Sequence, residues 1–483
     1  MSNQPTAHLL TAAGTALLGA ALLCLSPGAA RAQKARLPNA PQVRLMAQLP
    51  QSSSPQMPVG PPPPMPAAPP IITNKGPQLT IHQAEQIALR NNPHISVARL
   101  LALAQGQVTR EARSAYMPTA YGDLEAVGSH SESRMSAVGD LQSSRLLEKA
   151  AGGLTVSQLI TDFGHTHNLV LSAQSNAKAQ IEDEAATHLD IILTVDQAFY
   201  RALTAQAVLR VAQETVAERQ AIVETVTALT KAKLRSDLDL SFADVQLSQA
   251  KLMLLDAENN NQVAMADLNT VLGSEQDTTY TLADQTPSNP SPPPQNAEPL
   301  VQQAFTTRPD LAALNDSYTA DVQYSKAERD QWMPTISAMA VVGGAPVRSD
   351  LFRSSSWYGG AGANVNIPVF NGFLFNAETR AAKLRANAEL EQVRNLRDDI
   401  ARDVRTAVLN TQDAFQRIAV EEQLLYQANF SFSLAQARYK LGLSGIIELS
   451  QSELQLTRAQ IGVATARYSY QTSLAELRYQ LGQ

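Results

Sequence analysis

Two periods of hydrophobic residues alternate along this chain. From Ile192 onward, apolar or small residues recur in steps of three and four, a spacing typical of long coiled-coil helices. The second half of the chain repeats this spacing from Val393 onward. Elsewhere, as from Ala361 to Val369, apolar residues occupy every second position, which predicts strands with one apolar face. We therefore expect long helices combined with pairs of strands.

The same order of elements is predicted in both halves of the chain. A helical pattern broken at a proline comes first, and two strands and a long helix with an antiparallel partner follow. In the first half these are residues 79–116 (broken near Pro93), 120–126, 154–160, about 168–233, and a return helix that ends at Gly273. In the second half they are residues 300–332 (broken near Pro309), 336–343, 360–369, and a helix pair that turns at 441–445 and ends at Gly482.

Matching motifs indicate that the two halves are copies of one unit. Met117-Pro118-Thr119 and Met333-Pro334-Thr335 are separated by 216 residues, and both motifs precede a predicted strand. Leu272-Gly273 and Leu481-Gly482, at the two ends of the return helices, are separated by 209 residues. Because the anchors keep their order and nearly their spacing, we interpret the chain as an internal duplication.

The N-terminus has the pattern of an export signal. An apolar run from Leu9 to Leu25 precedes a small-residue cleavage pattern that ends at Ala32, although no Lys or Arg stands before the run. An uncleaved membrane anchor is the alternative. Lipidation at Cys24 is disfavoured because the bulky Leu23 precedes it. We expect cleavage after Ala32 and a mature chain without cysteine, which suits an oxidising periplasm.

Proline clusters divide the rest of the chain. Residues 33–78 hold 13 of the 27 prolines and are expected to form an extended tail, either an inert spacer or a docking peptide. The predicted organisation is a signal peptide (1–32), a Pro-rich disordered tail (33–78), a first repeat (79–273), a Pro-rich linker (274–299) and a second repeat (300–483).

Composition excludes several classes of function. The net charge of −6 provides no basic surface for nucleic acid, and the single cysteine excludes a disulfide framework and a Cys-ligated zinc site. No phosphate loop, nucleophile elbow or paired acid/base motif occurs, so we expect neither an enzyme nor a cofactor. His165 and His167 could share a face and bind a metal, but no carboxylate or cysteine supports them at a suitable spacing. We expect that pair to be a solvated junction.

The strands have features of membrane strands. They reach about ten residues, the length that crosses an outer membrane when tilted. Four aromatic residues stand near strand ends, where an interfacial belt is expected: Tyr116, Trp332, Trp357 and Tyr358. A transmembrane barrel needs about eight strands or more, and four strands per chain cannot close one. Because open sheet edges are not tolerated in lipid, we predict a homotrimer that pools twelve strands.

The sequence resembles the TolC-like outer-membrane efflux proteins, the outer membrane factor family. The resemblance rests on the duplicated order and on these motifs: Leu79–Ala88 with Asn92-Pro93, the two Met-Pro-Thr boundaries, Pro368–Gly372, Tyr439–Leu443 and the terminal Leu477–Gly482. It implies a mixed α/β membrane protein, in which a trimeric outer-membrane β-barrel of four strands per chain continues into a long antiparallel α-helical coiled-coil barrel in the periplasm. The implied function is the outer-membrane channel of a tripartite efflux pump or type I secretion system in a Gram-negative bacterium.

The resemblance also implies partners and exported substrates. The partners would be outer-membrane lipid, a periplasmic adaptor (membrane fusion) protein and an inner-membrane pump, and the exported substrates would be drugs, other small molecules or proteins.

Two alternatives to the channel function are a periplasmic coiled-coil adaptor and a structural envelope protein. An adaptor would need a lipoyl-like or barrel domain that is not visible, and a structural coiled coil would not need two amphipathic strand pairs.

The resemblance places a gate and a docking surface at the turns of the helix pairs. It assigns the periplasmic gate to Glu448, with Asp239 as its first-half counterpart and Tyr439 as a residue that holds neighbouring coils together. A second gate acid of the family falls on Gln451 and is missing here. The implied adaptor-docking tip consists of Lys440, Leu441, Gly442, Leu443, Lys233 and Leu234. The first-half turn lacks the family's glycine near Arg235, which leaves open whether both tips have the same shape.

Overall fold

The computed structural model describes residues 76–127, 134–135, 144–145, 149–274, 278–287, 290–346 and 355–483. These residues belong to one compact unit, which spans residues 72–483. The predicted signal peptide and residues 33–75 of the predicted tail lie outside the described residues. The elements are β1 (Gln78–Leu79), α1 (Ile81–Asn91), α2 (Pro93–Ser114), β2 (Thr119–Val127), β3 (Arg134–Met135), β4 (Ser144–Arg145), β5 (Lys149–Thr161), α3 (His165–Lys231), α4 (Asp237–Val271), β6 (Thr281–Leu282), α5 (Glu298–Thr307), α6 (Pro309–Asp330), β7 (Thr335–Pro346), β8 (Ser355–Asn366), α7 (Leu374–Lys440) and α8 (Ile446–Gln480).

The helices of the two halves match in length. α3 and α7 each have 67 residues, α4 and α8 each have 35, and α2 and α6 each have 22. The shorter α1 and α5 precede the prolines that open α2 and α6. Proline fits at the first position of a helix because its missing N–H would be unpaired there in any case. The predicted duplication of helices and strand pairs is thus present in the structure.

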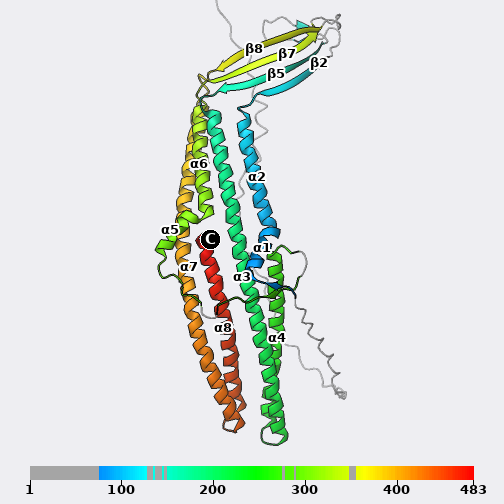
Figure 1. Cartoon of the computed structure of the whole chain (residues 1–483), viewed down its shortest axis with the longest axis vertical. Helices are drawn as coiled ribbons and strands as arrows, with labels where there is room; N and C mark the ends of the chain where they lie inside the picture. Colours follow the sequence, from blue (N-terminus) through cyan, green and yellow to red (C-terminus); the bar gives the residue numbers. More distant parts are fainter. Residues whose placement is uncertain are drawn as a thin grey trace, which may run out of the picture. The chain divides into compact units, whose positions relative to one another are not determined.

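Each of the two long helices, α3 and α7, takes part in two layers of the fold. On the side of the sheet, α3 packs against α2 and α6, and α6 packs against α7 (Figure 1). Toward the opposite end, α3 packs against α4 and α8, and α8 packs against α7. The order across this second layer is therefore α4–α3–α8–α7, so α4 and α7 are its outer helices. Small residues such as Ala212, Ala250 and Ala459 are buried in these contacts and allow close approach of the helices.

Four strands form one antiparallel sheet in the order β2–β5–β7–β8 (Figure 1). The register aligns the predicted apolar positions on one face, as in the row Ala120–Val156–Ala340–Ala361. The strands are longer than predicted, since β5 begins at Lys149 and β8 at Ser355, and the sheet differs from the prediction in two further respects. β8 ends at Asn366 rather than at Val369, since Pro368 cannot donate to a ladder, and the register of β5 shifts between Leu159 and Thr161.

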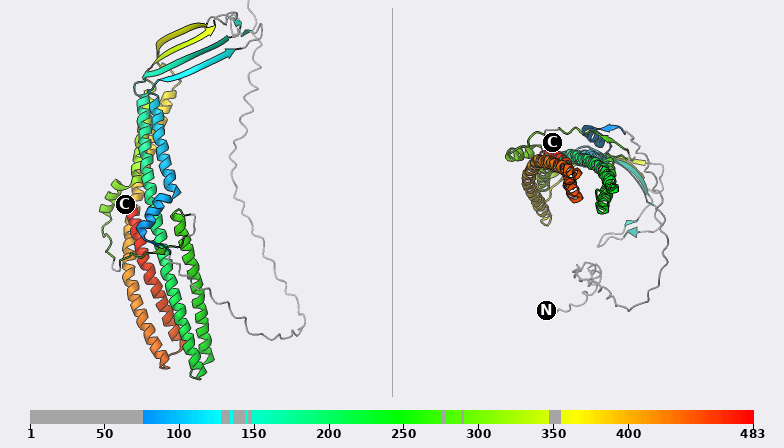
Figure 2. Two further views of the ribbon diagram at one scale, coloured as in Figure 1. Left: turned by 45° about the vertical axis from the view of Figure 1, so that its right-hand side comes forward. Right: turned by 90° about the horizontal axis from the view of Figure 1, so that it is seen from below.

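Two cores midway along the helices, one in each repeat, join the proline breaks to the ends of the return helices. Phe199 of α3 and Leu268 of α4 are buried in the first core together with Ala84 and Ala88 of α1. A parallel pairing of β1 with β6 lies on this core, so Gln78, assigned by sequence to the tail, belongs to the ordered fold. In Figure 2, α1 and α5 lie on the convex side of the helical layer.

The return helices end against the proline breaks in both repeats. Gly273 and Gly482 have φ values of +70° and +71°, a conformation that favours glycine. A Cβ atom would approach the carbonyl oxygen of Asn91 to 2.9 Å at the first site and that of Thr307 to 2.8 Å at the second. Glycine is therefore required at both ends by backbone conformation and by space.

The linker between the repeats is held against the helices by tyrosines. The Tyr468 hydroxyl donates to the Asp284 carboxylate at 2.8 Å, and the Tyr470 hydroxyl donates to the Ser291 carbonyl oxygen at 2.6 Å. The amide of Gln412 on α7 donates to the Pro294 carbonyl oxygen at 2.8 Å. The described residues of the Pro-rich linker are thus hydrogen-bonded to both α8 and α7. Among the helices in the described part of the chain, none is long and apolar enough to cross a membrane.

Candidate functional site

The two hairpin tips, residues 232–236 between α3 and α4 and residues 441–445 between α7 and α8, have the same backbone conformation. The Leu234 N–H donates to the Leu229 carbonyl oxygen, and the Leu443 N–H donates to the Arg438 carbonyl oxygen, both at 2.9 Å. In each tip the preceding residue is left-handed, with φ of +57° at Lys233 and +74° at Gly442. The first tip therefore takes the shape of the second although it lacks the glycine near Arg235.

The residues assigned to adaptor docking are exposed at these tips. Leu234 is 70% exposed, Leu441 is 74% exposed and Leu443 is 67% exposed, which is unusual for leucine. Lys233 and Lys440 stand beside them and are also exposed. The tips therefore present apolar side chains next to positive charge in the single chain.

Tyr439 and Arg235 join the two tips to each other. The Tyr439 ring is 3% exposed and packs with Val226 and Leu449. The Arg235 guanidinium lies 4.4 Å from the centre of this ring and donates to the carbonyl oxygens of Tyr439 at 3.0 Å and Ser444 at 3.3 Å. One side chain of the first hairpin thereby holds the backbone and an aromatic ring of the second.

The two candidate gate acids occupy matching positions in the first turns of α4 and α8. The Asp239 N–H donates to the Ser236 hydroxyl, which caps α4, and acids in a first helical turn complement the helix dipole. Glu448 lies 3.4 Å from Arg438 of the same hairpin, and both side chains are 48% exposed. Burial raises the pKa of Tyr439, the Arg235 guanidinium lowers it and the Asp239 carboxylate raises it.

Sequence reasoning noted Arg235 only as the place of a missing glycine and did not find its contacts. The structure brings Arg235 and Tyr439 together and places Asp239 in the first turn of α4, whereas Glu448 has its ion pair with Arg438.

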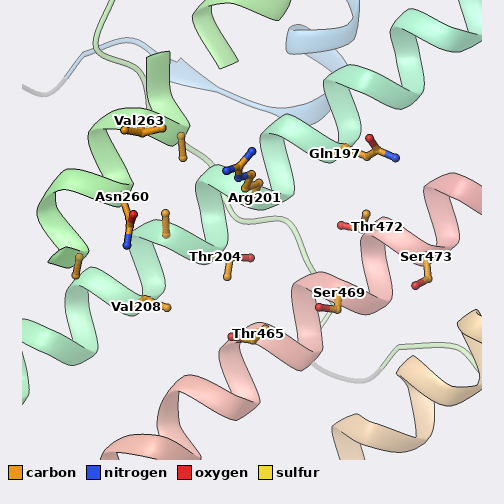
Figure 3. Close-up of a pocket in the computed structure, with 13 residues that line it drawn as sticks. Gln197, Arg201, Thr204, Val208, Asn260, Val263, Thr465, Ser469, Thr472 and Ser473 are labelled. Carbon is orange, nitrogen blue, oxygen red and sulfur yellow. The ribbon is translucent and has the colours of Figure 1, made fainter. Parts of the chain in front are cut away.

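A groove lined by apolar side chains and by hydroxyl groups lies farther along the helical layer. It has a volume of about 650 Å³ and lies between α3, α4 and α8 (Figure 3). Its walls carry the hydroxyl groups of Thr204, Thr465, Ser469, Thr472 and Ser473. Arg201, at the same groove, forms an ion pair with Asp267 at 3.3 Å. Ala264 of α4 lines the groove and also belongs to the buried core around Phe199, so the groove borders that core.

The aromatic residues of the sheet form two groups. Tyr116 and Trp332 stand where α2 and α6 pass into β2 and β7, and Trp332 packs edge-on against Phe375. Trp357 and Tyr358 lie at the other end of the sheet, paired with Gly344 and Gly343. Trp357 is 77% exposed. The two groups are thus separated by nearly the whole length of β7.

One of the two histidines considered for metal binding, His165, has another contact. His165 Nδ1 lies 2.9 Å from the Ala327 carbonyl oxygen, at the start of α3. Within the described ranges, no group of three or more His, Cys, Asp or Glu residues is arranged to hold a metal ion.

The sequence matches the outer membrane efflux protein family over residues 85–274 and 300–483, which include both repeats with their tips. The chain belongs to this family. The family resemblance predicted from the duplicated motifs is therefore confirmed, and so is the expectation of an outer-membrane efflux protein whose helices extend into the periplasm. The family consists of outer-membrane efflux proteins, not of enzymes.

Individual relatives agree with this family. The cation efflux system protein CusC of Escherichia coli O157:H7 is 24% identical over 411 residues, which cover 82% of this chain and 84% of CusC. The putative multidrug resistance outer membrane protein MdtQ of Shigella flexneri is 23% identical over 384 residues, 77% of this chain and 79% of MdtQ. The crystal structure of VceC from Vibrio cholerae shares the fold, with a TM-score of 0.69, 19% identity and coverage of 83% of this chain and 96% of VceC.

Proposed function

We propose that three copies of this chain form a continuous outer-membrane and periplasmic channel that works in a tripartite efflux pump. The observation that carries this proposal concerns the two lateral sides of the chain. On each side, the last strand of the sheet and the last helix of the helical layer have no neighbour beyond them within the described part of the chain. β2 and β8 are the edges of the sheet, and α4 and α7 are the outer helices of the layer.

The two sheet edges suit one another. β2 and β8 run in opposite directions because successive neighbours in the order β2–β5–β7–β8 are antiparallel. The β8 edge of one copy can therefore pair with the β2 edge of the next as an ordinary antiparallel ladder. Three copies give twelve strands, which is enough to close a barrel and to leave no edge in lipid.

The outer helices also suit one another. Exposed apolar side chains follow α4 and α7 on the faces that no helix of this chain covers, and head-to-tail contacts of two such faces generate a closed ring. On α4 they include Leu238, Phe242, Val245, Leu252 and Leu255, and on α7 they include Leu409, Val420, Leu424, Phe430 and Leu434. Burial of these two rows against each other would supply the stability of the helical tunnel.

The tips would form the periplasmic end of this tunnel. We place the gate there, with Glu448 and Asp239 as its carboxylates and with Tyr439 holding the coils. In a ring of three, Glu448 side chains repel one another and attract cations. The exposed Leu234, Leu441 and Leu443, with Lys233, Lys440 and Gly442, would contact the adaptor protein, which in turn contacts an inner-membrane pump. The proposed limits of the repeats, residues 79–273 and 300–483 with a linker over 274–299, include both tips.

The exported substrates are proposed to be small molecules. CusC is named for cation efflux, MdtQ for multidrug resistance and SrpC of Pseudomonas putida for solvent efflux, so relatives at similar identity carry unlike names. A wall of threonine and serine hydroxyls, as in the α3–α4–α8 groove, would let solutes pass without strong binding. The inner-membrane pump would then select the substrate.

Two measurements on one preparation test the proposal. The protein is purified in detergent, its mass is determined by light scattering, and it is added to a planar lipid bilayer. We expect a trimer that conducts ions. A monomer, or a trimer that never conducts, would favour a periplasmic adaptor or a structural envelope protein instead.

A further inference from the structure

The contact between α3 and α8 joins the two hairpins and contains a row of polar side chains. The hydroxyl oxygens of Thr215 and Thr457 lie 3.4 Å apart. One turn farther toward the tips, the Arg219 guanidinium donates to the Ser450 hydroxyl at 3.4 Å, and Arg219 Nε lies 2.9 Å from Glu453 Oε1. A charged pair thus adjoins the hydroxyl groups of Thr215 and Ser450 in this contact.

This pair is buried in the protomer. The side chains of Arg219 and Glu453 are 5% and 0% exposed. Apolar residues flank the pair on both sides, with Val226 and Leu449 toward the tips and Leu456 away from them. Beyond the close approach of Arg219 Nε, neither oxygen of Glu453 has a hydrogen bond of good geometry within the described part of the chain.

The charges that face Glu453 come from one neighbouring helix. α3 contributes the Arg219 guanidinium and, farther away, the Glu218 carboxylate. On the other side, α7 packs Ala428 and Phe432 near Leu456 and brings apolar surface. Burial raises the pKa of Glu453 to about 7, Arg219 lowers it and Glu218 raises it. The loss of hydration therefore outweighs the attraction of Arg219, as is common for a buried ion pair whose remaining lone pairs are not satisfied.

The direction of the coupling follows from the two states of the contact. If α8 parted from α3, water would reach the carboxyl and its pKa would return toward the ordinary value of 4.5. The packed contact consequently binds a proton more tightly than the parted contact does. Acidification then favours packing, and a rise of pH through about 7 favours parting.

We propose that Glu453 is a buried proton-binding site that couples the packing of the two hairpins to pH, so that proton uptake tightens the α3–α8 contact and proton loss loosens it. This coupling belongs to the single protomer and does not depend on channel activity. Its consequence for the gate rests on the proposed function, because looser hairpins would widen the tunnel at the tips.

The test measures the distance between the hairpins directly. Leu234 and Leu443, both exposed and at matching positions in the two hairpin tips, are replaced by cysteine and spin-labelled in a Cys24→Ser background. Labelled chains are co-expressed with an excess of unlabelled chains, so that distances arise within one chain, and are measured by pulsed electron resonance in detergent. We expect the longer distances to gain population between pH 5.5 and 8.5, with a midpoint near pH 7.

Four variants distinguish protonation of Glu453 from other effects of pH on the distance between the hairpins. Glu453→Gln imitates the protonated group and is expected to keep the short distance at both pH values. Arg219→Gln removes the compensating charge and should move the midpoint above that of the wild type. Arg219→Met with Glu453→Leu removes both charges at similar volume and should be packed at both pH values, which also covers a failure of Glu453→Gln to fold. Glu448→Gln, at an exposed acid on the same helix, should retain the wild-type shift.

Two results would overturn the proposal. One is a wild-type distance that does not change with pH, and the other is a pH-dependent shift that persists without Glu453. Because the distance is measured without a bilayer, failure of this proposal is distinguishable from failure of the channel function.

Discussion

Lys233 and Gly442 occupy the same place in the two hairpin tips and share a left-handed backbone, with φ of +57° and +74°. The N–H of the next residue closes the turn at 2.9 Å in both tips. A residue with a Cβ atom pays roughly 1–2 kcal/mol for this conformation, whereas glycine adopts it freely. The first tip thus keeps the conformation of the second at a cost in stability.

Lys233→Gly should stabilise the protein by about 1 kcal/mol, because glycine removes the strain of the left-handed conformation. The measurement is the midpoint of thermal or denaturant unfolding in detergent. Gly442→Ala is the matched control and should destabilise by a similar amount. A Cβ at Gly442 meets no atom within 4 Å, so backbone conformation alone would account for the loss.

Arg235→Gln should weaken the link between the tips and raise the resting conductance of the channel. The change removes the cation–π contact with Tyr439 and the bonds to two carbonyl oxygens, together worth about 1–2 kcal/mol. Tyr439→Phe is the control, since the Tyr439 hydroxyl has no hydrogen-bond partner within the described ranges and the ring remains. If Tyr439→Phe opened the channel as much as Arg235→Gln does, the hydroxyl would have to bind a neighbouring chain.

Glu448→Ala should reduce cation selectivity and block by divalent cations while the yield of trimer stays unchanged. Single-channel recording measures both properties. A mutant that keeps wild-type selectivity and divalent block would show that Glu448 is only an exposed first-turn acid paired with Arg438.

Val365→Asp should prevent insertion into the outer membrane, whereas Asn364→Asp should be tolerated. Val365 pairs with Ile336 on the apolar face of the sheet, and Asn364 pairs with Ser337 on the other face. A charge that faces lipid near the middle of the membrane costs on the order of 2 kcal/mol per copy. Fractionation of outer membranes measures insertion, and equal insertion of both variants would contradict the assignment of the two faces.

Much of the fold could be predicted because its elements are long and periodic. The breaks at Pro93 and Pro309, the helix ends at Gly273 and Gly482 and the four strands of the sheet follow from the pattern alone. The strand end at Asn366 and the register shift near Leu159 were missed. The alternation of apolar and polar residues does not show where the hydrogen bonds between two strands end or shift. The short β1 and β6 were missed because a strand of two residues is too short to show an alternation of apolar and polar side chains.

The candidate site was less predictable because its contacts join residues about 200 positions apart. Arg235 and Tyr439 meet across the two repeats, and nothing local in either segment indicates it. The Arg219–Glu453 pair left a weak signal: the apolar row of α3 passes from Val216 to Val223 without a member near Arg219. A gap of this kind in a coiled-coil row indicates a buried polar residue when its partner row has one too.

The equal lengths of α3 and α7, and of α4 and α8, restrict how this chain can change in size. One additional heptad in α3 alone would carry the first tip roughly 10 Å beyond the second and separate Arg235 from Tyr439. The same heptad in all four helices would preserve every cross-repeat contact at the tips. The length of the tunnel can thus change only through matched insertions or deletions in both repeats. An insertion or deletion in one repeat alone would first misalign the two hairpin tips at the periplasmic end.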